Sequence, residues 1–349
     1  MHRPHRTRSC TGVAVIRCVG FALMVSHGAA RADAISEFYA SHSLTFIIGS
    51  SSGGTFDTTA RVAARFLPKY IPGNPSVTPQ NMPGASHVRA TEYLANIAPR
   101  DGTALAFVQP SVILNKVTAP SARYNPADMT WIGRVAPARN VGFATTASGV
   151  HSVEAARRRE LILGAAGSTG PAAMAPWALN RMIGAKFRLV RGYTDDTATM
   201  VAVERGEVMG MGSINYASLL RHAEWIERGA IKLLYTISAE RMAASPQTPT
   251  IVELVPGAAD KAVMGLIAAI PAIGVTILGA PGIPAERAAV LRNAASQMFA
   301  DAGFIAEMRR LEMDVEPMRG EELGAVVRTV MDTPRDIVEQ LKSQTAPMD

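Results

Sequence analysis

The chain has 349 residues, a formal net charge of +6 and an apolar fraction of 48%. This length predicts two domains, and the apolar fraction excludes a largely disordered chain. The positive charge alone would suggest nucleic acid or an acidic membrane as partner, but most of it lies at the N-terminus of the chain, so it is no argument for either.

The N-terminal 32 residues have the pattern of a secretory signal peptide. Three arginines lie within the first ten residues, a mostly apolar stretch follows over Thr11–Val25, and Ala30-Arg31-Ala32 forms a small-x-small cleavage box. A membrane anchor is the alternative, although the apolar run is shorter than the ~20 residues that span a bilayer. We expect residues 1–32 to be removed and the protein to be periplasmic.

Removal of this segment changes the charge and the cysteine count. Five of the 35 basic residues are lost, so the mature chain keeps 30 against 29 acidic residues. Cys10 and Cys18, the only two cysteines, are lost as well. We therefore expect no disulfide, no thiol nucleophile, no metal, no cofactor and no nucleic-acid partner.

Strands, small-residue loops and helices alternate along the first part of the chain. The apolar run Leu44–Ile48 predicts a buried strand, followed by a Gly/Ser loop and a helix that Asp57 caps and Pro68 limits. Residues 76–81 predict an edge strand because they contain Pro79. The next helix, capped by Ser86, precedes a strand over residues 103–109.

The middle of the chain repeats this order. Strands are predicted at residues 160–163, 187–190, 208–211 and 231–237, with a helix from Pro171 to about Gly184. Two or three amphipathic helices are predicted beyond Ala285. Prolines and glycines should break any helix between Gly265 and Pro284, where we predict a buried strand near residues 273–278.

This alternation predicts an α/β fold with mostly parallel sheets in two halves, and a ligand cleft at the carboxyl ends of the strands. Each half opens with a Gly/Ser loop before a helix N-terminus, an arrangement that binds anions. The loop hydroxyls are those of Ser50, Ser51, Ser52 and Thr55 in the first half and Ser168 and Thr169 in the second. Alternatively, such loops serve only chain geometry.

Enzyme and nucleotide-binding motifs are missing from the sequence. It contains neither G-x-G-x-x-G nor G-x-x-x-x-G-K-[ST], and neither G-x-S-x-G nor H-E-x-x-H. His42, His87, His151 and His222 lack ligand spacing and are expected on the surface or at helix caps. We therefore expect no catalytic residues and no enzyme.

Asp195 and Asp196 form an adjacent acidic pair with two interpretations. Either Asp195 is a helix N-cap, or the pair contacts a ligand ammonium group or ordered water. Tyr193, just before them, either donates its hydroxyl into a cleft or packs in the core.

Seven short motifs, in order over residues 44–320, resemble one family. They are Ser52-Gly-Gly-Thr-Phe-Asp-Thr58 with Ala60-Arg61, Asn81-Met-Pro-Gly-Ala85, Ala98-Pro-Arg-Asp-Gly-Thr103, Gly164–Gly170, Tyr193, Gly206-Glu-Val208 before Asn215, and Ser245–Glu253. The pattern is similar to that of tripartite tricarboxylate transporter receptors, the Bug-type solute-binding proteins.

The resemblance implies a periplasmic-binding-protein-like α/β fold with two lobes around a ligand cleft, joined by crossover strands. Lobe 1 would comprise residues 33–143 and 270–349, and lobe 2 residues 144–269. The implied function is to capture a small carboxylate and deliver it, as a monomer, to one large and one small membrane subunit. The implied ligand contacts are Ser51, Ser52, Gly53, Gly54, Thr55, Phe56, Asp57, Gln109, Ser111, Ser168, Thr169, Gly170, Tyr193, Asp195 and Asn215.

The chain departs from the family pattern at the acidic pair. Asp195 and Asp196 stand where the family has small residues, and two negative charges would repel a carboxylate. Either they cap the helix or the ligand also carries an amine. Two other functions stay open: a ligand sensor for a membrane signalling protein, and an α/β enzyme.

Overall fold

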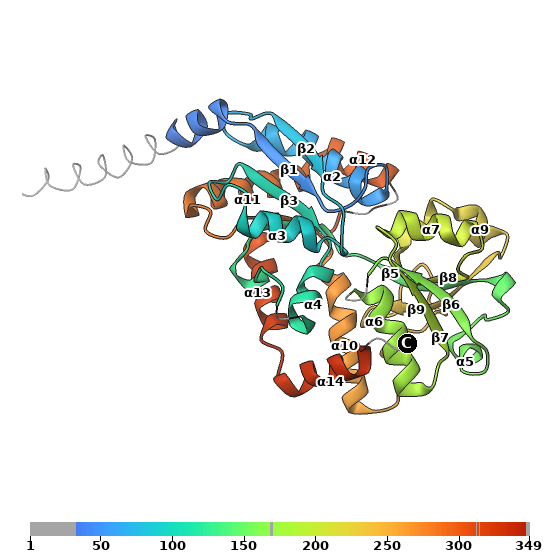
Figure 1. Ribbon diagram of the computed structural model, residues 1–349. Coiled ribbons are helices and arrows are strands. Elements are labelled where there is room, and N and C mark those ends of the chain that lie inside the picture. Colours follow the sequence, from blue (N-terminus) through green and yellow to red (C-terminus); the bar gives the residue numbers. More distant parts are fainter. Residues whose placement is uncertain (1–32, 120, 168–169, 312, 314, 347–349) are drawn as a thin grey trace, which may run out of the picture.

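The computed structural model describes residues 33–119, 121–167, 170–311, 313 and 315–346. The expected signal peptide, residues 1–32, lies outside the described residues. Two β-sheets occupy separate regions of the molecule, and helices cover both (Figure 1). No helix in the described ranges is both long and apolar enough to cross a membrane.

The first sheet has six strands in the order β11-β4-β10-β3-β1-β2. Their bounds are β1 Leu44–Ile48, β2 Val77–Asn81, β3 Ala104–Val108, β4 Thr130–Ala136, β10 Val275–Gly279 and β11 Met318–Arg319. β1 runs parallel to β2 and β3, whereas β10 lies antiparallel between β3 and β4. β2 lies at the edge, as Pro79 predicts.

The second sheet has five strands in the order β7-β6-β8-β5-β9. Their bounds are β5 Asn140–Thr145, β6 Leu161–Ala165, β7 Phe187–Arg191, β8 Gly210–Asn215 and β9 Ile231–Ile237. β6 is parallel to β7 and β8, and β5 is antiparallel to β8 and β9. Both sheets are therefore mixed, because each contains antiparallel pairs. The sequence prediction of mostly parallel sheets is wrong on this point.

The helices pack on both sheets and between them. Their bounds are α2 Thr55–Phe66, α3 Val88–Asn96, α4 Ser111–Thr118, α5 Val153–Ala156, α6 Pro171–Ile183, α7 Asp196–Glu204, α8 Tyr216–Leu220, α9 Ala223–Glu227, α10 Ala258–Ile273, α11 Ala285–Ala300, α12 Ala302–Arg310, α13 Gly320–Met331 and α14 Arg335–Thr345. Four helices thus follow residue 285, more than the two or three predicted.

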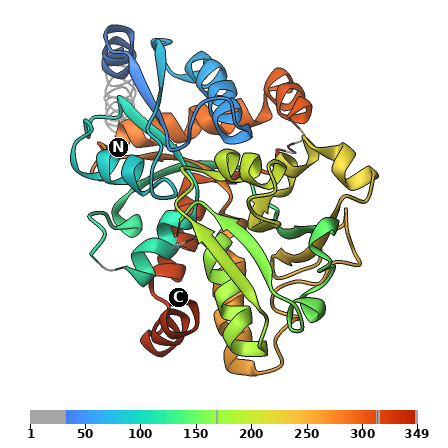
Figure 2. The same cartoon turned by 45° about the vertical axis from the view of Figure 1, so that its right-hand side comes forward.

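The chain passes between the two sheets twice. It leaves the first sheet at β4 and enters the second at β5, and it returns through α10 to β10. α10 packs against α4 of the first region and α6 of the second, and Figure 2 shows it beside α6. The C-terminal α14 also contacts α6 and α10, so the two regions share an apolar helical base.

The structure corrects two sequence predictions about elements, the helix break before residue 273 and the bounds of one strand. α10 runs through Gly265 and Pro271, because its buried apolar face, including Met264 and Ile267, packs in the largest core cluster. Pro271 lies near the helix end, where few backbone hydrogen bonds are lost. The strand expected at residues 208–211 is present as β8, but its bounds were misplaced, because it begins at Gly210 and continues to Asn215.

One glycine sets how closely α6 approaches the second sheet. A Cβ atom at Gly212 of β8 would lie 2.1 Å from the carbonyl oxygen of Ala172 and 2.6 Å from Pro176. We predict that Gly212→Ala lowers the free energy of unfolding by about 1–3 kcal/mol in urea denaturation, since α6 must move away. Gly265→Ala in α10 is the control, because no atom lies within 4 Å of its Cβ position. It should raise the free energy of unfolding by about 0.5–1 kcal/mol, since alanine favours a helix over glycine. Equal effects of the two changes would contradict this packing.

Candidate functional site

A cavity lies where the carboxyl ends of strands from both sheets meet. Its walls include the segments that follow β1, β3, β6 and β7, namely residues 49–51, 109–111, 166–167 with 170–172, and 194–197. It encloses about 120 Å³, roughly ten times the space that one water molecule needs. The carboxyl ends of strands in α/β sheets are the usual place for a small ligand, and the sequence predicted this location.

Three helices begin at the cavity without a side-chain cap. α2, α4 and α6 start there, and their N-cap residues Gly54, Pro110 and Gly170 make no side-chain hydrogen bond to the first turn. The first turn of a helix presents unpaired backbone N–H groups and the positive end of the helix dipole. Each such end stabilises a negative group by about 0.3–1 kcal/mol when exposed and up to ~2 kcal/mol when partly buried.

The fourth helix at the cavity, α7, is capped by the protein itself. Asp195 is its N-cap, and Oδ1 accepts a hydrogen bond from the backbone N–H of Ala198 at 2.9 Å. This geometry confirms the N-cap interpretation of Asp195. Its Oδ2 also accepts from the backbone N–H of Ser51 at 3.3 Å. Asp195 therefore links the loop after β1 in the first sheet to α7 on the second.

Asp196, the first residue of α7, also lines the cavity. Burial, the largest cause, and the negative charge of Asp195 together raise the pKa of its carboxyl group to about 6. A hydrogen bond with the Gln109 side chain acts in the opposite direction. The ionised form of Asp196 is therefore disfavoured in the folded protein.

His87 is a buried, neutral residue at the cavity wall. It occupies the N-cap position of α3 without capping it, and its side chain is only 5% exposed. Burial lowers its pKa to about 4, although the nearby Asp195 acts in the opposite direction. Of the two positions expected for this histidine, the surface is wrong, whereas His87 does hold an N-cap position, although its side chain makes no capping hydrogen bond. The cap expected from Ser86 is wrong, because His87 and not Ser86 holds that position.

The loop that carries His87 has an uncommon backbone conformation. Ala85, Ser86 and His87 all have positive φ values, of 47°, 50° and 72°, which cost free energy in residues other than glycine. The Ser111 hydroxyl donates to the carbonyl oxygen of Ser86 at 3.3 Å and helps to hold this loop. Gly49 faces the imidazole, where a Cβ atom would lie 2.2 Å from Nδ1.

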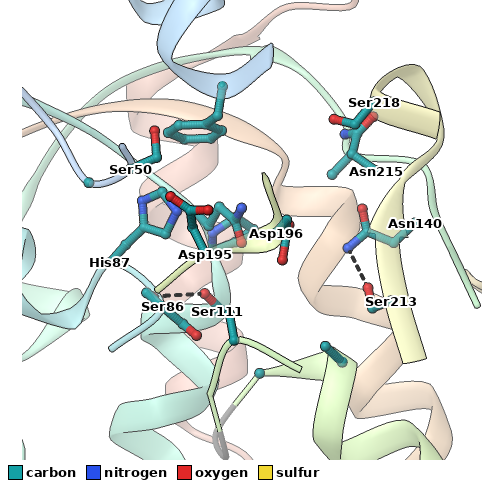
Figure 3. Close-up of a pocket in the computed structure, with 18 of the residues that line it drawn as sticks. Ser50, Ser86, His87, Ser111, Asn140, Asp195, Asp196, Ser213, Asn215 and Ser218 are labelled. Carbon is teal, nitrogen blue, oxygen red and sulfur yellow. Dashed lines mark hydrogen bonds between the residues drawn. The ribbon is translucent and has the colours of Figure 1, made fainter. Parts of the chain in front are cut away.

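The second sheet contributes neutral polar side chains (Figure 3). Asn140 of β5 donates through Nδ2 to the Ser213 hydroxyl of β8 at 3.1 Å. Asn215, which lies opposite Asn140 in the strand register, accepts from the N–H of Ala217 at 2.9 Å and caps α8. Amide and hydroxyl groups of this kind can donate hydrogen bonds to a ligand oxygen.

The structure brings eight of the fifteen predicted site residues to the cavity wall: Ser51, Gly54, Phe56, Gln109, Ser111, Gly170, Asp195 and Asn215. Ser168 and Thr169 lie outside the described residues. The side chain of Thr55 is likewise not described. Four others are not part of the wall: Ser52, Gly53, Asp57 and Tyr193. Tyr193 instead packs beside the apolar cluster of the second sheet.

Sequence reasoning missed several wall residues: Ser86, His87, Asn140, Ser213 and Ser218. Neither Asn140 nor Ser213 lies in a predicted strand or helix, and neither belongs to a sequence motif that indicates a ligand contact. Asp196 was named in the sequence as part of the acidic pair, with contact to a ligand ammonium group or ordered water as the alternative to capping, and the structure places it on the wall. Within the described ranges, no group of three His, Cys, Asp or Glu residues is placed to hold a metal ion.

Asp57 supports the site from behind rather than lining it. Its carboxylate accepts hydrogen bonds from the N–H of Gly53 at 2.9 Å, from Nε of Arg61 at 3.0 Å and from Nδ2 of Asn81 at 2.8 Å. The N-cap of α2 is Gly54, so the capping role predicted for Asp57 is wrong. Asp57 lies in the first turn instead and anchors the loop between β1 and α2.

The fold and site together define a periplasmic-binding-protein type of molecule, with two α/β lobes and a ligand cavity between them. Residues 59–278 match the protein family described as "Tripartite tricarboxylate transporter family receptor". The chain belongs to this family of solute-binding receptors. The same family was suggested by the order of its sequence motifs.

Known proteins similar to this chain agree with that assignment. A Cupriavidus necator protein, "UPF0065 protein in gbd 5'region", is 27% identical over 277 residues, covering 77% of this chain and 79% of its own. The periplasmic binding protein BugD has a similar fold, with a TM-score of 0.68 and 17% identity, over 87% of this chain and 98% of its own.

Two further solved structures share the fold and contain a ligand. The R. palustris protein Rpa4515 with adipate has a TM-score of 0.67 and 21% identity, over 87% of this chain and 97% of its own. MatC from Rhodopseudomonas palustris with bound malate has a TM-score of 0.66 and 18% identity, over 87% of this chain and 99% of its own.

The contacts of Asp57 generate a stability prediction. Burial raises the pKa of Asp57, but the hydrogen bonds from Arg61, Gly53 and Asn81 outweigh it and lower the pKa below its usual value. Asp57→Ala should lower the free energy of unfolding at pH 7 by about 2–3 kcal/mol. Because the folded pKa is depressed, this contribution is present above the unfolded pKa near 4 and is lost as the pH falls through the folded value.

Chemical denaturation at pH 7 and at pH 3 measures this effect. The exposed Glu227 of α9 offers a control, since Glu227→Ala should change stability by less than about 0.5 kcal/mol. A loss at Asp57 that is as small as the loss at Glu227, or that does not shrink toward pH 3, would contradict the anchoring role.

Proposed function

We propose that this protein is an extracytoplasmic solute-binding protein that captures a small carboxylate and delivers it to a tripartite tricarboxylate-type transporter. The observation that carries the proposal is the convergence of three uncapped helix N-termini, those of α2, α4 and α6, on one cavity. Such ends bind anions without a charged side chain. The related structures with adipate and malate contain carboxylates of suitable size.

The remaining parts of the proposal follow from the family and the sequence. The mature protein, free of residues 1–32, would act in the periplasm as a monomer. Residues 33–143 with 270–349 would form one lobe and residues 144–269 the other, and they would close around the ligand. The partners would be one large and one small membrane subunit. The family consists of receptors, which favours binding without catalysis.

Carboxylate binding should stabilise the mature protein. A ligand at 100 times its dissociation constant adds about 2.7 kcal/mol, which for a chain of this size raises the melting temperature by roughly 5 °C. We expect this shift with at least one member of a panel of di- and tricarboxylates, aromatic carboxylates and acidic amino acids. A shift caused only by uncharged sugars or by simple amines would contradict the proposal.

Two variants of the N-cap of α6 test the mechanism. A Cβ atom at Gly170 has an open position, with its nearest neighbour, Cβ of Ser111, at 3.8 Å. Gly170→Asp should cap α6 and place a negative charge at the cavity, so carboxylate affinity should fall at least about tenfold. Gly170→Asn provides the same cap without the charge and should lose much less in isothermal titration. Equal losses would contradict an electrostatic role for this helix end.

The location of the protein is tested by its N-terminus. When the full chain is expressed with its own leader in a Gram-negative host, we expect the product in the periplasmic fraction. Its intact mass should correspond to a first residue at Asp33, because the cleavage box ends at Ala32. A product that keeps residues 1–32 and sediments with membranes would support the anchor alternative instead.

A further inference from the structure

The charge on the cavity wall is one-sided. Among the described residues that line the cavity, Asp195 and Asp196 are the acidic ones, and neither lysine nor arginine occurs. Both acids lie at the start of α7, whereas the N-cap residues of α2, α4 and α6 make no side-chain hydrogen bond to the first turn. One side of the cavity therefore attracts a negative group, and the α7 side attracts a positive one.

Capping alone does not explain Asp196. The N-cap of α7 is Asp195, which already makes the hydrogen bond to Ala198. Asp196 stands beside a like charge, and within the described ranges neither acid forms an ion pair with lysine or arginine. Its one side-chain hydrogen bond is with the neutral Gln109. In the ligand-free protein the ionised form of Asp196 is disfavoured by burial and by the charge of Asp195. A bound cation would stabilise this ionised form.

Buried polar groups without a partner mark the same region of the wall. The hydroxyl of Ser50 and Nδ1 of His87 have no hydrogen-bond partner among the described residues, and their side chains are 8% and 5% exposed. Figure 3 shows His87 beside Asp195, with Ser50 nearby. Buried polar atoms in folded proteins are nearly always satisfied by protein groups or ordered water, so these two atoms mark this part of the wall as polar.

We propose that the ligand is a carboxylate that also carries a protonated amine, with its ammonium group held by Asp195 and Asp196. The inference rests on the proposed function, which places the ligand carboxylate at the N-termini of α2, α4 and α6. An ammonium group has three donors, and an ionised carboxylate offers about four lone-pair sites. Asp195 accepts two backbone N–H groups and Asp196 one side-chain donor, so both keep acceptor capacity for the ligand.

Matched pairs of acids that differ by one amine test this proposal. Isothermal titration at pH 7 would compare succinate with aspartate, glutarate with glutamate, and adipate with 2-aminoadipate. We expect at least one amine-bearing acid to bind roughly tenfold to a hundredfold more tightly than its partner, as hydrogen bonds between charged groups do. The inference is overturned if no amine-bearing acid binds more tightly. Binding of the amine-free acids would in that case still support the carboxylate proposal.

The variant Asp196→Asn tests whether Asp196 is the source of the preference for amine-bearing acids. This nearly isosteric change removes one charge and keeps a hydrogen-bonding side chain, so the amine preference should fall at least about tenfold while binding of the amine-free acid is kept or improved. Glu227→Gln, on an exposed position of the same region, is the control and should leave the preference unchanged. An unchanged preference in Asp196→Asn would overturn the role of Asp196, and the wild-type comparison remains decisive if this variant does not fold.

The pH dependence separates an ionised Asp196 from a protonated one that donates to a ligand oxygen. With its pKa at about 6, Asp196 loses its proton between pH 5 and 7. His87 stays neutral in this range because its pKa is about 4, and Asp195 is the other titratable group facing the site. Both carboxyl groups of glutamate titrate at about 4.3 or below. The affinity for glutamate should therefore rise from pH 5 to 7, and in Asp196→Asn it should not change over this range. A fall over this range would overturn the proposal.

Discussion

The positive ends of helix dipoles meet at one cavity because parallel strands of two sheets end there. Each strand–loop–helix unit turns its first helical N–H groups toward the carboxyl end of its own strand. β1, β3 and β6 deliver α2, α4 and α6 to the cavity in this way. The positive potential of the site thus comes from the backbone and its topology, and the wall needs no arginine or lysine to bind an anion.

Other features keep this arrangement in place. Asp57 holds the first loop from behind through Gly53, Arg61 and Asn81. Gly212 lets α6 lie close to β8. Contacts between Ser51 and Asp195 connect the two sides of the cavity directly, so the helix ends of both regions face the same small space. Stability and ligand recognition therefore share residues, and changes to the loops should affect both.

Sequence patterns predicted the parts that depend on local chemistry. The apolar run Leu44–Ile48 is β1, Pro171 begins α6, and Asp195 caps α7, because strand burial, the missing N–H of proline and N-capping are set by near neighbours. The approach of Asn140 to Ser213, and the burial of His87, depend on the pairing of distant segments and on a strained loop. One sequence contains no signal for those contacts, and the helical role of Pro271 likewise follows from tertiary packing.

The central claim is that the backbone ends of α2, α4 and α6 bind the ligand carboxylate. The most direct test is a crystal structure of the mature protein with the tightest-binding acid. A carboxylate oxygen should lie within hydrogen-bond distance, about 2.7–3.2 Å, of the first-turn N–H groups of at least two of these helices. A carboxylate bound to an arginine side chain at the cavity rim, away from all three helix ends, would contradict the claim.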